Sequence, residues 1–254
     1  MKKLYRFRKL KHDSVNKFCQ FAVDGSTYFG QSENALNSEM LIYIDAEKIL
    51  SKYEVSPELV NSIEMALREH VIHNYYIVCF VTTNQLDECD MWREYADDNG
   101  FCLVYDEQDI LNAIKPIIIK GEKSIIFRDV DVGKSKTDLT LFLDRFLKKM
   151  NGKYYDERAV KYAAEHWFDD LKPEESMGLI QSMFHKIGDF PEKYEKRICI
   201  RDPKLKGTYI WRLLTIKPVE VICSSLMPRK EMEIIRKSAR KHRIVFSIHE
   251  VNHS

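Results

Sequence analysis

Residues 79–106, CFVTTNQLDECDMWREYADDNGFCLVYD, form the organising centre of the predicted fold. They overlap residues 75–82, an almost unbroken apolar, β-branched and aromatic run that predicts a strand buried on both faces. A helix is expected at residues 90–98, ending at Asn99-Gly100, a pair that favours a left-handed cap. A second strand should follow at residues 101–105. The centre therefore predicts a strand, a helix and a strand in succession.

The segments before this centre are shorter. We expect a strand at residues 4–8, a helical turn around residues 14–21 and a strand at residues 26–30. A helix should begin near Ala46. The clearest helix start is Ser56-Pro57-Glu58, because Ser can cap the helix, Pro suits its first turn and Glu suits the positive end of its dipole.

The segments after the centre alternate irregularly between helix and strand. Asp106 should cap a helix that runs to Ile114, followed by strand or buried connection at residues 117–119 and 124–127. The later expectations are helices at 137–150, 155–170 and 173–187, strands at 196–201, 208–216 and 219–223, a helix at 228–242 and a strand at 243–251. We predict an α+β fold, a mixed sheet with flanking helices and a helical layer around residues 137–187. Residues 1–254 are expected to form a single domain, with 137–187 as a helical insertion in the alternative division.

The composition limits the classes of function. The chain has 254 residues and a formal net charge of +1, so it has no global field that would attract nucleic acid or anionic lipid. Its basic N-terminus lacks the apolar run of a signal peptide, and no stretch approaches a membrane span. We expect a cytoplasmic protein without a membrane partner. The six cysteines include no CxxC pair, which predicts buried reduced thiols.

Two arginines near the N-terminus are candidate ligand-binding residues. Arg6 and Arg8 share one face of the expected first strand, and Tyr5 and Phe7 share the other. Two aligned guanidinium groups suit a phosphate or a carboxylate. The alternative is that the arginines are the solvated face of an amphipathic strand.

Two aromatic residues of the central helix form a second candidate. Trp92 and Tyr95 lie one turn apart on the same helical face, where the indole N–H and phenol O–H could line a pocket. The alternative is that both rings pack the helix onto the sheet.

A carboxylate and a guanidinium lie close together late in the chain. On a strand, Glu195 and Arg197 point to the same side, so Glu195 should stay ionised and serve as an acceptor or electrostatic stabiliser. The alternative is a structural ion pair. His70 and His73 share a helix, but no further ligand stands at a recognisable spacing, and we predict no metal site.

Several catalytic signatures are missing from the sequence, including a Walker loop, GxSxG, HExxH and the paired Asp of metal-dependent nucleases. The helix at residues 228–242, PRKEMEIIRKSARKH, is rich in basic residues and could contact phosphates. An ordinary solvated helix face explains the pattern as well, because Glu231 and Glu233 dilute the charge.

Several of these segments together resemble an uncharacterised bacterial family, domain of unknown function 2971. Residues 4–8 are similar to its opening LYRYR strand, and Cys79-Phe80, Met91-Trp92, Tyr95-Ala96 and Gly100-Phe101-Cys102 to its central motif. Phe190 with Glu195-x-Arg197, and the strand at residues 219–222, resemble its later elements. Ala35-Leu36-Asn37-Ser38 stands where the family normally has Phe-Asn-Asp-Pro.

The layout of the family also looks like the plan of ADP-ribosyltransferases, in which an arginine grips a dinucleotide phosphate and a glutamate stabilises the reacting ribose. The family resemblance itself implies little about activity. The analogy of layout leads us to expect an intracellular nucleotide-handling protein that uses NAD, with Glu195 catalytic and Arg6, Arg8, Trp92, Tyr95 and Arg197 binding the ligand. One alternative is a non-catalytic interaction protein of a bacterial phage-defence or toxin system, with a protein partner. A second alternative is a nucleic-acid-binding protein, although the near-neutral charge disfavours nucleic acid as a partner.

Overall fold

The computed structural model describes most of the chain, in ranges separated by gaps. The described residues are 2–10, 29–31, 42–43, 45–53, 56–82, 91–120, 124–133, 137–138, 140–150, 184–187, 195–201, 209–210 and 214–251.

A nine-stranded sheet forms the body of the protein, and it has two halves. In the first half the order is β1 (Lys3–Arg8), β5 (Phe101–Asp106), β12 (Glu220–Ser224) and β13 (Val245–His249). In the second half β4 (Tyr75–Val81) pairs on one side with β10 (Glu195–Arg201), which pairs with β6 (Ser124–Asp129). On its other side β4 pairs with β2 (Phe29–Gln31), which pairs with β11 (Tyr209–Ile210).

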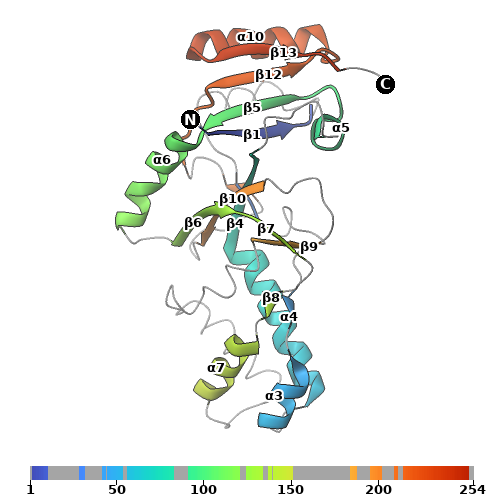
Figure 1. The fold of residues 1–254 in the computed structure, drawn as a ribbon, viewed down its shortest axis with the longest axis vertical. Coiled ribbons are helices and arrows are strands. Elements are labelled where there is room, and N and C mark those ends of the chain that lie inside the picture. Colours follow the sequence, from blue (N-terminus) through green and yellow to red (C-terminus); the bar gives the residue numbers. More distant parts are fainter. Residues whose placement is uncertain are drawn as a thin grey trace.

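The two halves meet where β1 and β4 pair at Tyr5 and Val81. Every pairing in this sheet is antiparallel except that of β12 with β13, which is parallel. Because β1 and β4 share so short a register, β4 turns away from β1 and leads into the lower part of the molecule (Figure 1). Late strand β10 thus lies beside β4, and β4 separates it from the first strand of the chain, because Val81 pairs with Glu195 on one edge and with Tyr5 on the other.

The helices lie at the two ends and along one side of the sheet. At one end α10 (Arg229–His242) covers β12 and β13, while α5 (Met91–Ala96) and α6 (Glu107–Lys120) lie at opposite ends of β5 (Figure 1). At the other end α4 (Pro57–Asn74) projects from β4 and packs with α3 (Ala46–Tyr53), which also contacts α7 (Thr140–Met150). Two small parallel pairs join β3 (Ile42–Tyr43) to β8 (Thr137–Asp138) and β7 (Asp131–Gly133) to β9 (His185–Ile187).

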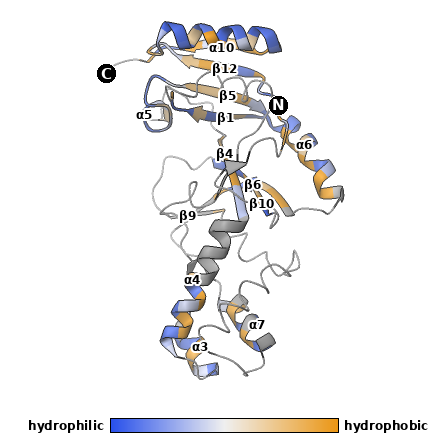
Figure 2. Ribbon diagram, turned by 180° about the vertical axis from the view of Figure 1, so that it is seen from behind, coloured by the Kyte–Doolittle hydropathy of each residue, from blue (hydrophilic) through white to orange (hydrophobic). Residues whose placement is uncertain are grey.

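The sheet is apolar on both faces, but the two clusters differ. One contains Leu4, Phe80, Leu103, Ile198 and Ile235 among others, and it lies under α6 and α10. The other contains Phe7, Met91, Trp92, Cys102 and Ile222 among others, and it lies under α5. Figure 2 shows the corresponding pattern on α10, whose outer surface is hydrophilic. The side chains of β1 therefore alternate between two separate cores.

The predicted α+β fold with a mixed sheet and flanking helices is confirmed. The strand that begins at Tyr75, the helix capped by Ser56 and the strand that begins at Phe101 all form as expected. Ser56 has extended dihedrals, and its hydroxyl accepts a hydrogen bond from the Leu59 N–H at 3.2 Å. The expectations for residues 14–21, 155–170 and most of 173–187 fall outside the described residues.

Three local predictions are wrong. Residues 117–119 are helical, because Ile110, Ile114 and Ile117 form a continuous stripe on the core, and α6 continues through Pro116. His185–Ile187 is a strand, because it pairs with β7, and that tertiary pairing overrides its helical periodicity. The strand expected at residues 208–216 does not run to Ile216, where the chain is irregular.

Gly100 has a different role from the predicted left-handed cap. The left-handed residues of this turn are Asp97 and Asp98, with φ of 49° and 57°. A Cβ at Gly100 would lie 2.0 Å from the Arg8 carbonyl oxygen and 2.6 Å from that of Ala96. Glycine is therefore required here because the backbones of α5 and β1 approach closely.

No helix among the described residues combines the length and the apolar character that crossing a membrane requires.

Candidate functional site

Strand β10 has a face of charged side chains that is buried. Glu195, Arg197 and Arg201 alternate along the strand and are 8%, 1% and 7% exposed. A period of two in charged residues usually marks a solvated strand face, but this face lies inside the protein. Buried charges are rare unless they are paired, so this strand carries an unusual concentration of polar chemistry.

Glu195 and Arg197 form a two-point ion pair. Nε of Arg197 donates to Oε1 of Glu195 at 2.5 Å, and Nη2 donates to Oε2 at 3.1 Å. Both side chains are positioned by the antiparallel register with β4, in which Glu195 faces Val81 and Arg197 faces Cys79. The guanidinium therefore holds the carboxylate in one orientation.

The thiol of Cys79 lies beside this ion pair, opposite Arg197 in the register of β4 with β10. The pKa of the Cys79 thiol is raised to about 12, mainly by burial and also by the Glu195 carboxylate, while the Arg197 and Arg6 guanidinium groups oppose the rise. The influence of Arg6 on this pKa is the smallest of these. Residues of β4 and β10 therefore form this cluster, and Arg6 of β1 affects it only through its charge.

Arg6 and Arg8 also lie beside a buried phenol. Burial raises the pKa of Tyr105, and the Arg6 and Arg8 guanidinium groups oppose that rise, with a hydrogen bond between Arg6 and the phenol. Leu4, opposite Tyr105 in the β1–β5 register, completes the same face of β1. The two arginines therefore lie close together, as their spacing predicts.

Trp92 packs on the other face of β1. Its ring meets Phe7 edge to face, with centroids 5.3 Å apart, and stacks on His249 at 4.7 Å. Val81 is paired with both Tyr5 and Glu195, and Tyr5 and Val81 pack against the Trp92 cluster. Because successive side chains of a strand point to opposite faces, Glu195 and Cys79 lie on the same face of the sheet as Trp92, and Arg6 lies on the other face. The indole Nε1 is buried and has no hydrogen-bond partner within the described part of the chain. Tyr95 is 41% exposed.

The structure therefore divides the predicted site residues into separate groups. Glu195 and Arg197 lie together beside Cys79, whereas Arg6 and Arg8 lie beside Tyr105. Trp92 belongs to the core under α5. Sequence reasoning missed Cys79 and Tyr105. The signal for Cys79 was its alternation with Ile77 and Val81 on a strand that must pair with β10.

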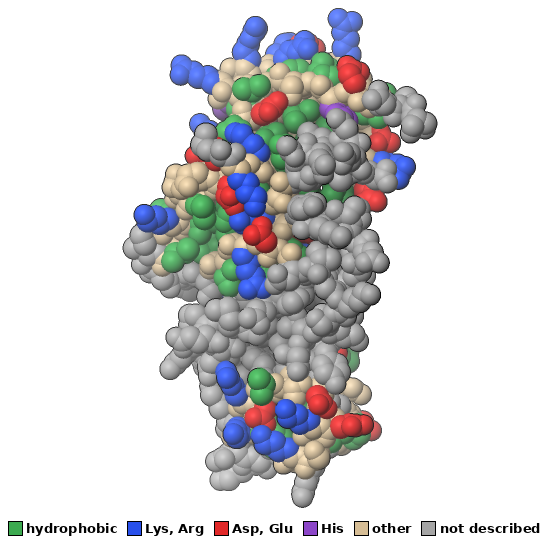
Figure 3. All heavy atoms as spheres, viewed as in Figure 1, with side chains coloured by type: hydrophobic (Ala, Val, Ile, Leu, Met, Phe, Trp, Pro, Cys, Tyr) green, Lys and Arg blue, Asp and Glu red, His purple; other side chains and the backbone are tan. Residues whose placement is uncertain are grey.

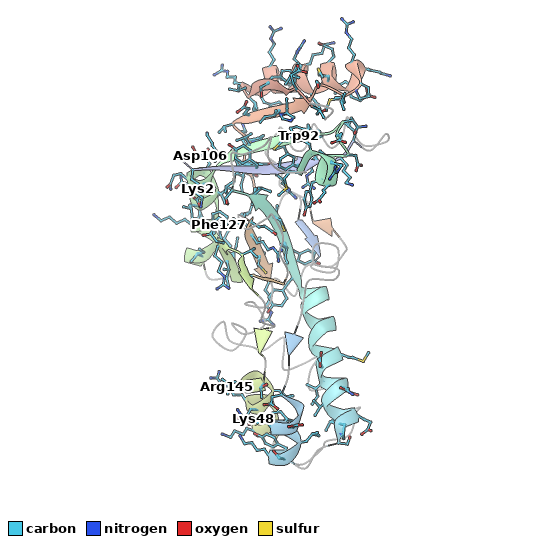
Figure 4. The ribbon with its side chains drawn as sticks, turned by 45° about the vertical axis from the view of Figure 1, so that its right-hand side comes forward. Lys2, Lys48, Trp92, Asp106, Phe127 and Arg145 are labelled. Atoms are coloured by element: carbon cyan, nitrogen blue, oxygen red, sulfur yellow. The ribbon has the colours of Figure 1, made fainter. Side chains whose placement is uncertain are left out.

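The opposite face of β10 carries a more exposed group of ion pairs. Lys196 pairs with Glu107 and lies 3.9 Å from Asp129, while Lys2 lies 3.8 Å from Asp129. In Figure 4, Lys2 and Asp106 lie near one end of β1, and Trp92 lies near the other. This group joins the start of β1 to α6 and β6, on the side away from the Cys79 cluster.

Within the described ranges, no three His, Cys, Asp or Glu side chains gather in a group that could hold a metal ion. Among the described residues, Cys79, Cys102, Cys199 and Cys223 form no disulfide. The polar chemistry available at Cys79 is therefore that of guanidinium groups, one carboxylate and a protonated thiol.

No curated protein and no solved structure matches this chain. A family model does match, over a segment that includes Met91-Trp92, Gly100-Phe101-Cys102 and Glu195-x-Arg197. The resemblance predicted from those motifs is confirmed: residues 91–198 match the family described as protein of unknown function, DUF2971.

Proposed function

We propose that this protein is a nucleotide-handling enzyme that transfers ADP-ribose from NAD. The observation that supports the proposal is the Glu195 carboxylate of a late strand, which Arg197 holds with two hydrogen bonds, while Arg6 of the first strand acts electrostatically on the neighbouring Cys79. ADP-ribosyl transfer needs a cation for the dinucleotide phosphates and a carboxylate for the charge that develops on the ribose. In this proposal Arg6 and Arg8 supply the cation and Glu195 supplies the carboxylate.

In the proposed reaction the bond between ribose C1′ and nicotinamide breaks, and nicotinamide leaves with the bonding electrons. An acceptor nucleophile bonds to C1′ and gives up a proton. Glu195 stabilises the oxocarbenium charge on the ribose, and Arg197 holds the carboxylate in place. Arg6 and Arg8 contact the phosphates.

Two other side chains receive no chemical role in this proposal. The pKa of about 12 keeps the Cys79 thiol protonated at neutral pH, so it is no nucleophile. Trp92 packs against Phe7 and His249, and we assign it to the core, away from the nicotinamide or adenine base.

The test is release of nicotinamide from millimolar NAD, measured by chromatography. We expect release by the wild-type protein and a rate at least about 100-fold lower for Glu195→Gln, because the variant cannot supply the negative charge. Arg6→Lys is a second variant, which keeps the positive charge but loses the planar fork, and its Michaelis constant for NAD should rise.

Glu107→Gln is the matched control. Glu107 also pairs with a basic residue of β10, but Lys196 lies on the opposite face of the strand. The control should keep the wild-type rate. A wild-type protein that releases no nicotinamide, or a folded Glu195→Gln variant as fast as wild type, would sink the proposal.

A second candidate is a non-catalytic interaction protein, as in bacterial phage-defence systems. It is favoured by the closed Glu195–Arg197 pair, in which Arg197 is 1% exposed, and by the placement of Arg6 on the opposite face of the sheet from Glu195. In that case these residues only stabilise the fold. The protein would then show no response to NAD, and Arg6→Lys would change its melting temperature alone.

A further inference from the structure

Helix α10 carries a dense row of basic side chains on its outer surface. Arg229, Lys230, Arg236, Lys237, Arg240 and Lys241 are all exposed, and so is Arg243, which follows the helix in a left-handed conformation. We call these seven residues the basic ridge. Figure 3 shows Lys and Arg side chains projecting from this end of the molecule.

The spacing places the ridge on one side of the helix. Its helical members form three adjacent pairs, which recur after seven and then four residues, so the pairs lie above one another. At about 1.5 Å per residue, the ridge extends roughly 18 Å from Arg229 to Lys241. It is therefore a straight line of cations rather than a scattered surface charge.

The opposite side of α10 is occupied by the protein's own core. Ile235 and Ala239 are buried, and Met232 packs against the same cluster. The guanidinium of Arg236 lies 4.9 Å from the Phe246 ring centroid, which fixes part of the ridge to β13. The helix cannot turn this apolar face toward a membrane, so a partner must bind through charge.

The acidic residues of α10 neutralise little of the ridge. Glu233 pairs with Arg236 at 2.9 Å, and Glu231 is only partly exposed. The whole chain has a formal net charge of +1, so the positive charge of the ridge is local. Such a surface matches a linear polyanion better than a partner whose negative charge is spread over a broad surface.

The chemistry of the ridge favours a duplex over a single strand. Helix α10 contains no Phe, Tyr or Trp, and single-stranded nucleic acids are held largely by aromatic stacking. A duplex presents one phosphate charge per about 1.7 Å of its axis, which matches a rod of cations without any base contact. We propose that the basic ridge binds the phosphate backbone of double-stranded nucleic acid, independently of base sequence.

The experiment is fluorescence anisotropy of a labelled 20-base-pair DNA duplex with the full-length protein, titrated at several salt concentrations. If about six cations contact phosphates, affinity should fall about 1,000-fold between 50 and 200 mM salt. The variant Lys230→Gln/Lys237→Gln/Lys241→Gln removes one charge from each pair of the ridge. The slope of log affinity against log salt should then decrease in magnitude by about 2.7.

A matched control changes the same number of charges at the other end of the molecule. Lys48→Gln/Arg145→Gln/Lys148→Gln alters exposed residues of α3 and α7, where Figure 4 labels Lys48 and Arg145. This control should keep both the wild-type affinity and the wild-type slope. Equal loss in the two triple variants would overturn the proposal, because it would show a response to net charge alone.

Two further arms distinguish other polyanions. Vesicles with one-third phosphatidylserine and a poly-glutamate peptide are titrated under the same conditions. Weaker binding to both than to the duplex supports the proposal. Tighter binding to either, or no binding of the duplex at 50 mM salt, overturns it.

Discussion

Replacement of Arg197 by Met should destabilise the protein strongly. Arg197 is 1% exposed and donates two hydrogen bonds to the Glu195 carboxylate. Arg197→Met keeps most of the side-chain volume but leaves that buried carboxylate without its cation. Breaking a buried ion pair on one side costs about 3–5 kcal/mol in the free energy of unfolding.

This cost is measurable in two ways. Urea denaturation followed by circular dichroism gives the free energy of unfolding directly. In a thermal scan, each kcal/mol lowers the melting temperature by about 2–4 °C for a chain of this size, so we expect a fall of roughly 6–20 °C.

The double variant Glu195→Met/Arg197→Met separates the pair from its surroundings. Because it removes both charges, it should cost less than Arg197→Met alone. A single variant that loses under about 1 kcal/mol, or a double variant that loses the sum of the two single changes, would refute the assignment of a coupled buried pair.

Three other predictions concern separate parts of the fold. Gly100→Ala should lower the free energy of unfolding by about 1–3 kcal/mol or more in urea denaturation, because the new Cβ would meet backbone atoms. Asp98→Gly should leave the free energy of unfolding unchanged or raise it, because Asp98 has a φ of 57°. Native protein at pH 8 should leave the Cys79 thiol unmodified by iodoacetamide in mass spectrometry, and labelling in the fold would contradict its pKa of about 12. Hydrogen bonds from Lys52 and Tyr53 hold the pKa of Asp144 below its ordinary value of 3.8, so the stability it contributes is present above that value and is lost as pH falls further. The melting temperature of Asp144→Asn should therefore differ from wild type at pH 7 and approach it in strong acid, and a constant difference would argue against the contact.

The sequence was sufficient for the central strands because their signals are local. The run that begins at Tyr75 is apolar on every residue, and only a strand covered on both faces buries all of it. The helix at Ser56 begins with a cap, a proline and an acid, each of which acts within one turn. Such elements can be predicted without knowing what packs against them.

The elements that failed depend on contacts that are distant in sequence. His185–Ile187 is a strand only because β7 lies beside it. Ile117 continues a helix because the core beneath α6 extends that far. Gly100 is required by the Arg8 carbonyl, which no pattern near residue 100 reveals.

The candidate site shows the same division. Alternation along β1 correctly placed Arg6 and Arg8 on one face and Phe7 on the other, since that depends only on the pleat. Which face of β1 is covered by α5 depends on tertiary packing. The aromatic side chain of Phe7, which contacts Trp92, is the sequence feature that could have indicated this face. The register of β10 with β4, which brings Arg197 to Cys79, could not be predicted from either strand alone.

The most direct test of the central claim is a thermal-shift titration with NAD. Binding to the folded state at about 100 times the dissociation constant adds about 2.7 kcal/mol, which should raise the melting temperature by roughly 5–10 °C. The account predicts a saturable rise in wild type and in Glu107→Gln, and a rise that needs higher NAD concentrations in Arg6→Lys. No rise at millimolar NAD, or the same concentration dependence in Arg6→Lys as in wild type, would contradict it.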